Sequence, residues 1–551
     1  MIKYLGTPNR EEPVKLPSKS QVGIFGILLI IALALSIKNY DSFQLGTYMD
    51  DSSYVVLAQS IALSDDYGLI NVPGQPQPTR YPFGFPLLLS PFAELFPDNP
   101  NLMKLASLLA TLLNASLLFV GWPYLSQNKS YWWGLIIAAL YLTSPLVVSH
   151  TRMVMSEPAF TTFILAALIL TEKYLSKDGN KPTKSLILGG IAAFALFIRT
   201  LGIALWIAIV IRVLLTLPIN KSLKILGYMF GGGIAVVLIV IILTPVAIPD
   251  LVPVEYVDQF QDPISWGQTQ IETSLVPRFL SAFTEYTKQH LRDTITPVGG
   301  GKRELEFGKR LGVDNLPLLT GLFIGILILL GSFSFLSKQG VSPTVYLFEI
   351  LYFGAILLWP WRGERFLYPL QPFLYYHFLL GILLVIGQIE RLKLFSRNAS
   401  RLISHICVGA VILTTLIFSI YKGFTDNTSS LEYTRDLRVG AIWLRENASN
   451  DAVIMAQQPQ SIYLYSQRKT IDYPRVANAT ELERLIHEQG VDYILVAPKL
   501  EWRADGSLAY DEYTLDVLLP FLNTLTEKEL LRLVYESEKD MTKVYQVINS
   551  Q

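Results

Sequence analysis

Residues 21–38 read QVGIFGILLIIALALSIK, and no charged side chain interrupts them before Lys38. A helix of roughly 20 apolar residues crosses the hydrocarbon core of a bilayer, so this stretch has the length of a membrane span. Backbone groups in lipid must pair within their own segment, which favours helices for long unbroken apolar runs. The residues around Arg199 fit either two short helices or one long bent helix. Counting them as two, we predict about eleven transmembrane helices, near residues 21–38, 102–121, 131–149, 158–175, 185–199, 201–218, 223–248, 316–336, 342–360, 366–388 and 402–421.

The composition also indicates a membrane protein. Of the 551 residues, 51% are hydrophobic and 16% are charged, and the mean hydropathy is +0.38. Soluble domains carry roughly 25% charged residues. The 45 basic and 45 acidic residues cancel, so there is no global field to attract nucleic acid, and we expect no nucleic-acid partner. The single cysteine, Cys407, excludes a disulfide within one chain.

Lysine and arginine in short loops mark the cytoplasmic side of a membrane protein. With a cytoplasmic N-terminus, alternate crossing places on that side a set of basic residues that includes Lys19, Lys129, Lys173, Lys221, Lys338 and Arg397. We therefore expect a multi-pass protein of the plasma (inner) membrane. Its non-cytoplasmic pieces are predicted to be the loop 39–100, a turn at 150–157, the loop 249–315 and the chain after 425. Ala32-Leu33-Ala34 has the form of a signal-cleavage site, but the apolar run is longer than most signal peptides have, so we favour a retained helix.

The chain divides into a membrane domain over 1–425 and a soluble α/β domain over 426–551. In the second, apolar runs at Ala452–Ala456, Ile462–Tyr465, Tyr493–Ala497 and Val544–Ile548 predict strands. A helix is expected at Ala479–Gln489, with Thr480 as its N-cap and Gly490 as its stop. The fold class is thus a helical membrane domain followed by a soluble α/β domain.

Two adjacent carboxylates, Asp50 and Asp51, stand just beyond the first span, and an amphipathic helical stretch follows them up to Ser64. One of the two suits a general base while its neighbour tunes the pKa or binds a cation. Both also suit a helix N-terminus, where carboxylates cap the chain and complement the dipole. The spacing favours neither interpretation, and the two are compatible.

Basic residues recur in the other predicted non-cytoplasmic segments. Each suits either the binding of a lipid phosphate or an anchoring role at the membrane interface, and anchoring is the commoner fate of such residues. Glu157 begins a membrane helix on the same predicted face as the aspartate pair. Carboxylates that face cations at a lipid boundary favour a reaction on a phosphate-bearing lipid. The basic residues of this face are Arg80, Arg152, Arg199, Arg362 and Arg365.

The motifs MDDSSYVVLAQSI (49–61), RYPFGFPLLLSPF (80–92), MSEPAF (155–160), LFIRTLGIAL (196–205) and RGERFLYPLQPFL (362–374) together resemble the GT-C superfamily of glycosyltransferases. The likeness is greatest to bacterial dolichyl-phosphate-mannose-protein mannosyltransferase-like and aminoarabinose-transferase-like members. It covers roughly residues 20–390 in motif order. WLRENASNDAVIMA (443–456) and SIYLYSQRKTIDYP (461–474) also resemble the soluble domain that follows in many such proteins.

The resemblance implies an inverting hexosyl- or pentosyltransferase that takes its sugar from a polyprenyl-phosphate-linked donor on the non-cytoplasmic face. The acceptor is expected to be a lipid, a glycan or a protein. By motif match, Asp50 or Asp51 is the catalytic base and Glu157 is the second acidic residue. Arg80, Arg199, Arg362 and Arg365 match donor-phosphate-binding positions, and Tyr54, Tyr81 and Arg152 lie in or beside the same motifs. Some relatives use a divalent cation, for which Asp51 and Glu157 are candidate ligands suited to magnesium or manganese.

Three other functions fit the same residues. A transporter or lipid flippase would use the charges as a pathway, and we keep it as the main alternative. An O-antigen ligase or polymerase is a second, although that class relies on arginines and a histidine. An accessory membrane subunit with a binding domain is the third.

Overall fold

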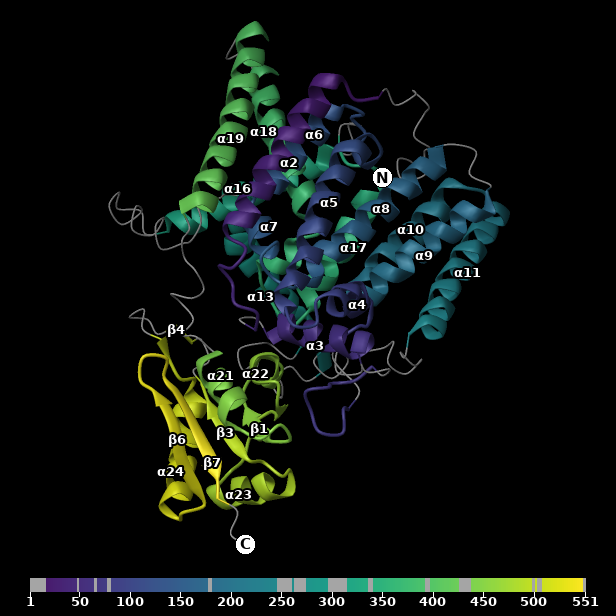
Figure 1. Cartoon of the computed structure of the whole chain (residues 1–551). Helices are drawn as coiled ribbons and strands as arrows, with labels where there is room; N and C mark the ends of the chain where they lie inside the picture. The colour runs from purple at the N-terminus through teal and green to yellow at the C-terminus, as the bar shows by residue number, and fades with distance from the viewer. Residues whose placement is uncertain are drawn as a thin grey trace.

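The computed structural model shows a bundle of helices with a smaller α/β domain against one end (Figure 1). The boundary between the two predicted domains falls at 426–437, outside the described residues, and most of the predicted loop 249–315 lies outside them as well. The structure describes residues 16–46, 49–63, 67–76, 81–176, 181–244, 260–261, 274–295, 315–334, 340–391, 397–425, 438–497, 501–502 and 508–548.

Within these ranges, five helical segments are long and apolar enough to cross a membrane. They are α2 (Lys19–Lys38), the segment Pro100–Leu125 formed by η1 (Pro100–Met103) and α5 (Lys104–Leu125), α8 (Ser156–Ser176), α11 (Ile219–Leu243) and α18 (Gln371–Arg391). Shorter apolar helices lie among them: α4 (Gly84–Leu95), α6 (Tyr131–Thr143), α9 (Pro182–Ile198), α10 (Ile203–Thr216), α16 (Leu316–Ser332), α17 (Pro343–Leu358) and the apolar part of α19 (Arg397–Thr425).

Every predicted span contains a helix within the described residues, and the span near 131–149 is interrupted. The stretch near 131–149 is divided by Ser144 and Pro145 into α6 and the short α7 (Pro145–His150). Around Arg199 the chain forms two helices, because Arg199 is extended (φ −148°, ψ 133°) between α9 and η2 (Thr200–Gly202). The interpretation as one long bent helix is therefore wrong. The break leaves the Arg199 side chain at a helix end.

Glycines bring neighbouring helices of the bundle into close contact. A Cβ on Gly189 of α9 would lie 1.9 Å from the Met229 carbonyl oxygen of α11, and one on Gly381 of α18 would lie 2.0 Å from the Leu327 oxygen of α16. Small residues are typical of helix contacts in membranes, where association depends on van der Waals packing rather than on the hydrophobic effect.

A buried ion pair joins three helices at a distance from the predicted site residues. Arg212 of α10 and Glu172 of α8 lie 3.4 Å apart (Nε–Oε1), and their side chains are 0% and 1% exposed. The same Glu172 oxygen accepts a hydrogen bond from the Thr344 backbone N–H at the start of α17, at 3.0 Å. Buried charges are retained only when paired, so this pair fixes how α8, α10 and α17 meet.

The C-terminal domain contains a five-stranded sheet in the order β2-β1-β3-β7-β6. Strands β1, β2 and β3 are parallel, and β7 and β6 extend the sheet in antiparallel fashion. Parallel neighbours need crossover connections, which here contain α22 and α23. The elements are α21 (Arg438–Asn447), β1 (Val453–Ala456), α22 (Pro459–Ser466), β2 (Lys469–Ile471), α23 (Ala479–Glu488), β3 (Tyr493–Val496), β4 (Glu501–Trp502), β5 (Leu508–Ala509), η7 (Thr514–Leu518), α24 (Leu519–Glu527), β6 (Leu531–Ser537) and β7 (Thr542–Val547).

Two details of this domain differ from the prediction. The run Ile462–Tyr465, expected as a strand, is helical and forms the centre of α22. Pro459 stands at the first turn of this helix, where its fixed φ favours helix formation, and four apolar residues are too few to distinguish the two periodicities. The N-cap of α23 is Asn478 rather than Thr480, since the Asn478 side chain accepts from the Glu481 N–H at 2.9 Å. Gly490, with φ +61°, follows this helix as expected.

The end of the bundle nearest the C-terminal domain is built from shorter elements (Figure 1). The helix predicted after the aspartate pair is α3 (Met49–Leu63), and it packs against α4 and α22. The other elements that contribute to this end are α13 (Leu275–Glu285), the π-helix η4 (Tyr286–His290), α14 (Leu291–Ile295) and η6 (Glu364–Leu367).

Candidate active site

Asp50, in the first turn of α3, binds residues from two distant segments. Its Oδ2 atom accepts a hydrogen bond from Arg365 Nη1 at 2.6 Å, and its Oδ1 atom accepts one from the Tyr81 hydroxyl at 3.0 Å. The Asp50 side chain is 17% exposed and that of Arg365 is 35% exposed, so the pair remains accessible. A guanidinium at this distance stabilises the ionised carboxylate.

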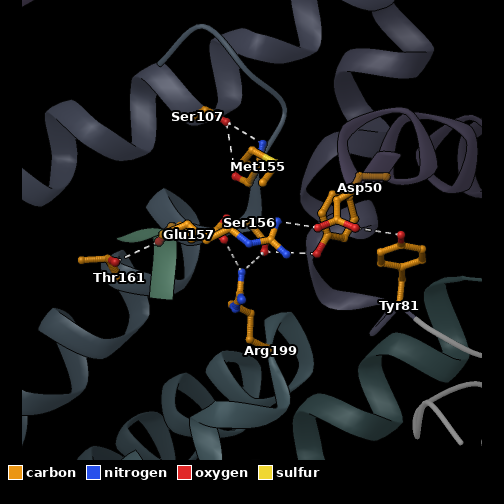
Figure 2. A network of polar contacts seen from close by, with 10 residues as sticks. Asp50, Tyr81, Ser107, Met155, Ser156, Glu157, Thr161 and Arg199 are labelled. Carbon is orange, nitrogen blue, oxygen red and sulfur yellow. Dashed lines mark hydrogen bonds and ion pairs between the residues drawn. The ribbon is translucent and has the colours of Figure 1, made fainter. Parts of the chain in front are cut away.

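A second carboxylate–guanidinium pair lies in the same network (Figure 2). Arg199 Nη1 is 2.7 Å from Glu157 Oε1, and the Glu157 side chain is 1% exposed. The same nitrogen donates to Ser156 Oγ at 3.0 Å, and Ser156 Oγ is in turn 3.2 Å from the Tyr54 hydroxyl. Because Tyr54 stands one helical turn after Asp50, α3 contributes to both pairs.

An aromatic ring connects the two arginines. The centroid of the Phe366 ring lies 5.2 Å from Arg365 Cζ and 5.7 Å from Arg199 Cζ. Cations within about 6 Å of an aromatic face are attracted by its quadrupole. The ring therefore lies near two guanidinium groups, each of which is also paired with a carboxylate.

The turn that presents Glu157 is fixed by α5. Ser107 Oγ accepts from the Met155 N–H and donates to the Met155 carbonyl oxygen, each at 3.4 Å (Figure 2). The Asn114 side-chain amide donates to the Pro158 oxygen at 2.9 Å. The residues on both sides of Glu157 are therefore bound to α5. Glu157 lies in the first turn of α8, where the helix dipole favours a carboxylate.

Asp51 has a different environment from Asp50. Its side chain is buried, Oδ2 accepts from the Gly46 N–H at 3.0 Å and Oδ1 accepts from its neighbour Ser52 N–H at 2.7 Å. Burial raises the pKa of Asp51 to about 8; the backbone donors act against this rise, and the charge of Asp50 adds to it. The aspartate pair was predicted to act either in catalysis or at a helix N-terminus. The contacts of Asp51 fit the second role, because they hold the loop at Gly46 against the first turn of α3.

Arg362 and Arg152, two other predicted residues, have their own partners in the structure. Arg362 binds α13, with Nη1 2.6 Å from Glu285 Oε2 and 3.1 Å from Ser281 Oγ. Arg152 is buried, donates to Ser42 Oγ at 3.0 Å and lies over the Phe43 ring, so it braces the loop after α2. Arg80 lies outside the described residues.

The described carboxylates do not fit the divalent-cation site expected from Asp51 and Glu157. Both Asp51 oxygens accept backbone hydrogen bonds, whereas Glu157 and Asp50 are neutralised by Arg199 and Arg365. Among the residues that the structure describes, no three histidine, cysteine or acidic side chains come together.

Sequence reasoning did not single out Ser156 and Phe366. Ser156 lies in the MSEPAF motif and Phe366 in RGERFLYP, so both were quoted, but a serine and a phenylalanine carry no chemical signal by themselves. Their roles depend on which guanidinium groups the fold brings to them.

The fold is similar to that of solved membrane glycosyltransferases of the GT-C superfamily, which agrees with the resemblance of the motifs. Solved structures that show this fold include the oligosaccharyltransferase AglB from Archaeoglobus fulgidus, in complex with an inhibitory peptide and a dolichol-phosphate. It superposes with a TM-score of 0.53 at 12% identity, over 97% of this chain and 74% of that one.

A second similar protein is ArnT from Cupriavidus metallidurans. Its apo structure superposes with a TM-score of 0.54 at 12% identity, over 97% of this chain and 99% of that one. A structure of ArnT bound to undecaprenyl phosphate gives a TM-score of 0.53 at 12% identity, over 96% of this chain and 98% of that one. No protein-family model and no curated protein sequence matches the chain.

Proposed function

We propose that this protein is a glycosyltransferase that moves a sugar from a polyprenyl-phosphate-linked donor to an acceptor nucleophile. The observation that carries the proposal is the Asp50–Arg365 pair, which places a carboxylate base beside a guanidinium on the accessible part of α3. Two fold relatives support the choice of donor, since AglB was solved with dolichol-phosphate and ArnT with undecaprenyl phosphate.

Asp50 is the general base in this proposal. It is the more exposed of the two aspartates and is stabilised as a carboxylate by Arg365. Asp51 is less suited to this role, because its side chain is buried and both of its oxygens already accept backbone hydrogen bonds. A general base contributes roughly 10²–10⁴-fold to rate.

The arginines bind the phosphate of the donor. Arg365 and Arg199 form the cationic pair around Phe366. Arg362 adds further donors, because its buried Nε and Nη2 atoms have no hydrogen-bond partner among the described residues. Forked guanidinium donors match phosphate oxygens well, and preorganised cations stabilise charge that develops on a leaving group.

The chemical step is a single displacement. The acceptor oxygen attacks the anomeric carbon and forms the new glycosidic bond, while its proton passes to Asp50. The bond between the anomeric carbon and the phosphate oxygen breaks, and the lipid phosphate leaves with the electron pair. As Asp50 takes the proton, its attraction for Arg365 weakens, which frees this guanidinium for the leaving phosphate. The configuration at the anomeric carbon is inverted.

The site is proposed to open on the non-cytoplasmic face, with the N-terminus in the cytoplasm. Support comes from the basic residues of the short loops and from the position of α3 at the bundle end next to the C-terminal domain (Figure 1).

The test is transfer of labelled sugar from a panel of synthetic polyprenyl-phosphate sugars by the purified full-length protein. We expect wild type to transfer sugar or hydrolyse the donor slowly. Asp50→Asn should lower kcat by at least about 100-fold, whereas Asp51→Asn should lower it clearly less. Asn is nearly isosteric with Asp, so both variants should purify as folded protein.

Equal activity in wild type and Asp50→Asn would remove this residue from the mechanism. Donor binding without turnover, for every donor and with lipid, glycan and peptide acceptors, would instead favour a transporter that uses the same charged residues.

A further inference from the structure

The C-terminal domain contacts the loop that leads into α3. Ser461 of α22 donates to the Gly46 carbonyl oxygen at 3.3 Å, and its Oγ atom lies 3.0 Å from Ser52 Oγ of α3. Tyr465, one turn later on α22, donates to the Leu45 carbonyl oxygen at 2.7 Å. Ser461 is fully buried, so these contacts are shielded from water and stronger for it.

Gly46 lies at the centre of these contacts. Its carbonyl accepts from Ser461, and its N–H donates to Asp51 at 3.0 Å. It has φ +96°, a conformation that glycine adopts at no steric cost, and a Cβ at this position would lie 2.7 Å from Ser461 Cβ. The loop thus approaches α22 as closely as glycine allows. Because the Gly46 N–H is bonded to Asp51, the position of the loop also affects the first turn of α3.

The loop after α3 is held by the same domain. Asn71 is fully buried; its carbonyl oxygen accepts from the Thr470 N–H of β2 at 2.6 Å, and its side chain donates to Thr470 Oγ1 at 3.1 Å. Lys469 Nζ donates to the Ile70 carbonyl oxygen at 2.6 Å. Segments on both sides of α3, at Leu45–Gly46 and at Ile70–Asn71, are therefore hydrogen-bonded to the C-terminal domain.

We propose that the C-terminal domain positions the catalytic base, with Ser461 and Tyr465 of α22 as positioning residues that act on Asp50 through Gly46, Asp51 and Ser52. This inference rests on the proposed function, because it assigns to α22 a part in the same site. Asp50 receives one hydrogen bond from Tyr81 and one from Arg365, and the direction of its backbone is set by the first turn of α3. A displacement of about 1 Å at a catalytic group costs roughly 100-fold in rate.

The experiment compares two double variants of the full-length protein. Ser461→Ala/Tyr465→Phe removes the two hydroxyls that hold the loop and leaves the aromatic ring and both Cβ atoms. The matched control, Ser537→Ala/Tyr510→Phe, removes the same two kinds of hydroxyl within the C-terminal domain, where Ser537 binds Asp540 and Tyr510 binds the Met541 carbonyl oxygen.

Three quantities are measured for each protein. They are kcat and KM for the donor that wild type uses, and the amide hydrogen-exchange rate of residues 45–55. For Ser461→Ala/Tyr465→Phe we expect kcat to fall at least about 10-fold with KM within about twofold of wild type. Exchange in the first turn of α3 should be at least about 10-fold faster. The control should match wild type in all three quantities within about twofold.

Faster exchange with a wild-type kcat would overturn the positioning role. Unchanged exchange would show that α22 does not hold the loop and would overturn it too, as would equal losses of kcat in both variants. A wild-type protein that transfers no sugar would count against the proposed function, while the exchange rates would still decide whether α22 fixes the start of α3.

Discussion

Arg365 Nη1 and Asp50 Oδ2 lie 2.6 Å apart although 315 positions separate the two residues in the chain. The pair joins the first turn of α3 to η6, which precedes α18. Ionised partners make hydrogen bonds stronger, so protonation of Asp50 would weaken this bond and leave the guanidinium available to an anion.

Substitution of Arg365 should affect turnover more than it affects folding. Arg365→Lys keeps the charge but loses the forked donor, so we expect kcat to fall roughly 10-fold. Arg365→Gln also loses the charge, and its kcat should fall roughly 100-fold or more. Initial rates with a labelled donor measure this effect. Arg484→Gln, which removes an exposed guanidinium that pairs with Glu488 in the C-terminal domain, should have wild-type rates. Equal rates in Arg365→Lys and wild type would contradict a forked contact between Arg365 and the donor phosphate.

The Glu157–Arg199 ion pair should be important for the stability of the folded protein. Removing one partner of a buried pair leaves an uncompensated charge, at a cost of about 3–5 kcal/mol. We therefore expect Glu157→Gln and Arg199→Gln each to lower the thermal unfolding midpoint in detergent clearly. The double variant should unfold at a higher temperature than the less stable single variant, because no unpaired charge remains. Additive losses in the double variant would show that the pair is not coupled.

Stability should fall as pH rises toward 8. Burial raises the pKa of Asp51 to about 8 in the folded protein, far above its value in an unfolded chain. The folded protein therefore favours the protonated form of Asp51. The resulting contribution to the free energy of unfolding is fully present below the pKa of the unfolded chain and is lost as pH rises through the folded pKa. Between about pH 5 and 8 the unfolded chain releases this proton while the folded protein retains it, so stability should fall steadily over this range.

Thermal unfolding midpoints between pH 5 and 9 test this dependence. Asp51→Asn carries no titrating proton, so the difference between variant and wild type should change with pH in the direction given above. Parallel curves for the two proteins would mean that Asp51 titrates below this range. The charges of Asp50 and Lys104 also influence the pKa of Asp51. The comparison is therefore made with Asp51→Asn, which keeps both of these neighbours.

Chelation should leave transfer nearly unchanged. Asp50 and Glu157 are neutralised by Arg365 and Arg199 rather than by a cation, so we expect activity within about twofold of the untreated value after EDTA treatment. The measurement is the initial rate before and after chelation, and again after addition of magnesium or manganese. Loss of activity that either ion restores would contradict the charge balance described here.

Gly381→Ala should separate α16 from α18. The added Cβ would lie 2.0 Å from the Leu327 carbonyl oxygen, and backbone cannot yield as a side-chain end can. The yield of monodisperse protein and the unfolding midpoint should both fall. Gly387→Ala is the matched control on the same helix, since nothing lies within 4 Å of its Cβ, and alanine there should be neutral or slightly stabilising. Equal behaviour of the two variants would show that the helices do not approach at Gly381.

The bundle was predictable because its signal is local. A run such as residues 21–38 specifies a helix through length and apolarity alone, and α2 occupies Lys19–Lys38. Prediction was weaker for short segments. Ile462–Tyr465 was expected as a strand and is part of α22, because four residues do not define a period and the surrounding packing decided the conformation.

The site was predictable as a set of residues on one face but not as a set of pairs. Asp50, Glu157, Arg199 and Arg365 were all named from their motifs, whereas which carboxylate meets which arginine depends on contacts between distant segments. Arg362 pairs with Glu285 on α13, a contact that no motif indicates. Ser156 and Phe366 acquire their roles only from these contacts.

The sequence by itself determined that the chain forms apolar helices with an α/β domain at its end, because hydrophobic length and periodicity act within each segment. Tertiary structure alone decided that Asp50 faces Arg365 while its neighbour Asp51 faces Gly46. Successive residues of a helix point in directions about 100° apart, so adjacent identical side chains face different partners, and only the packed fold determines which partner stands in each direction.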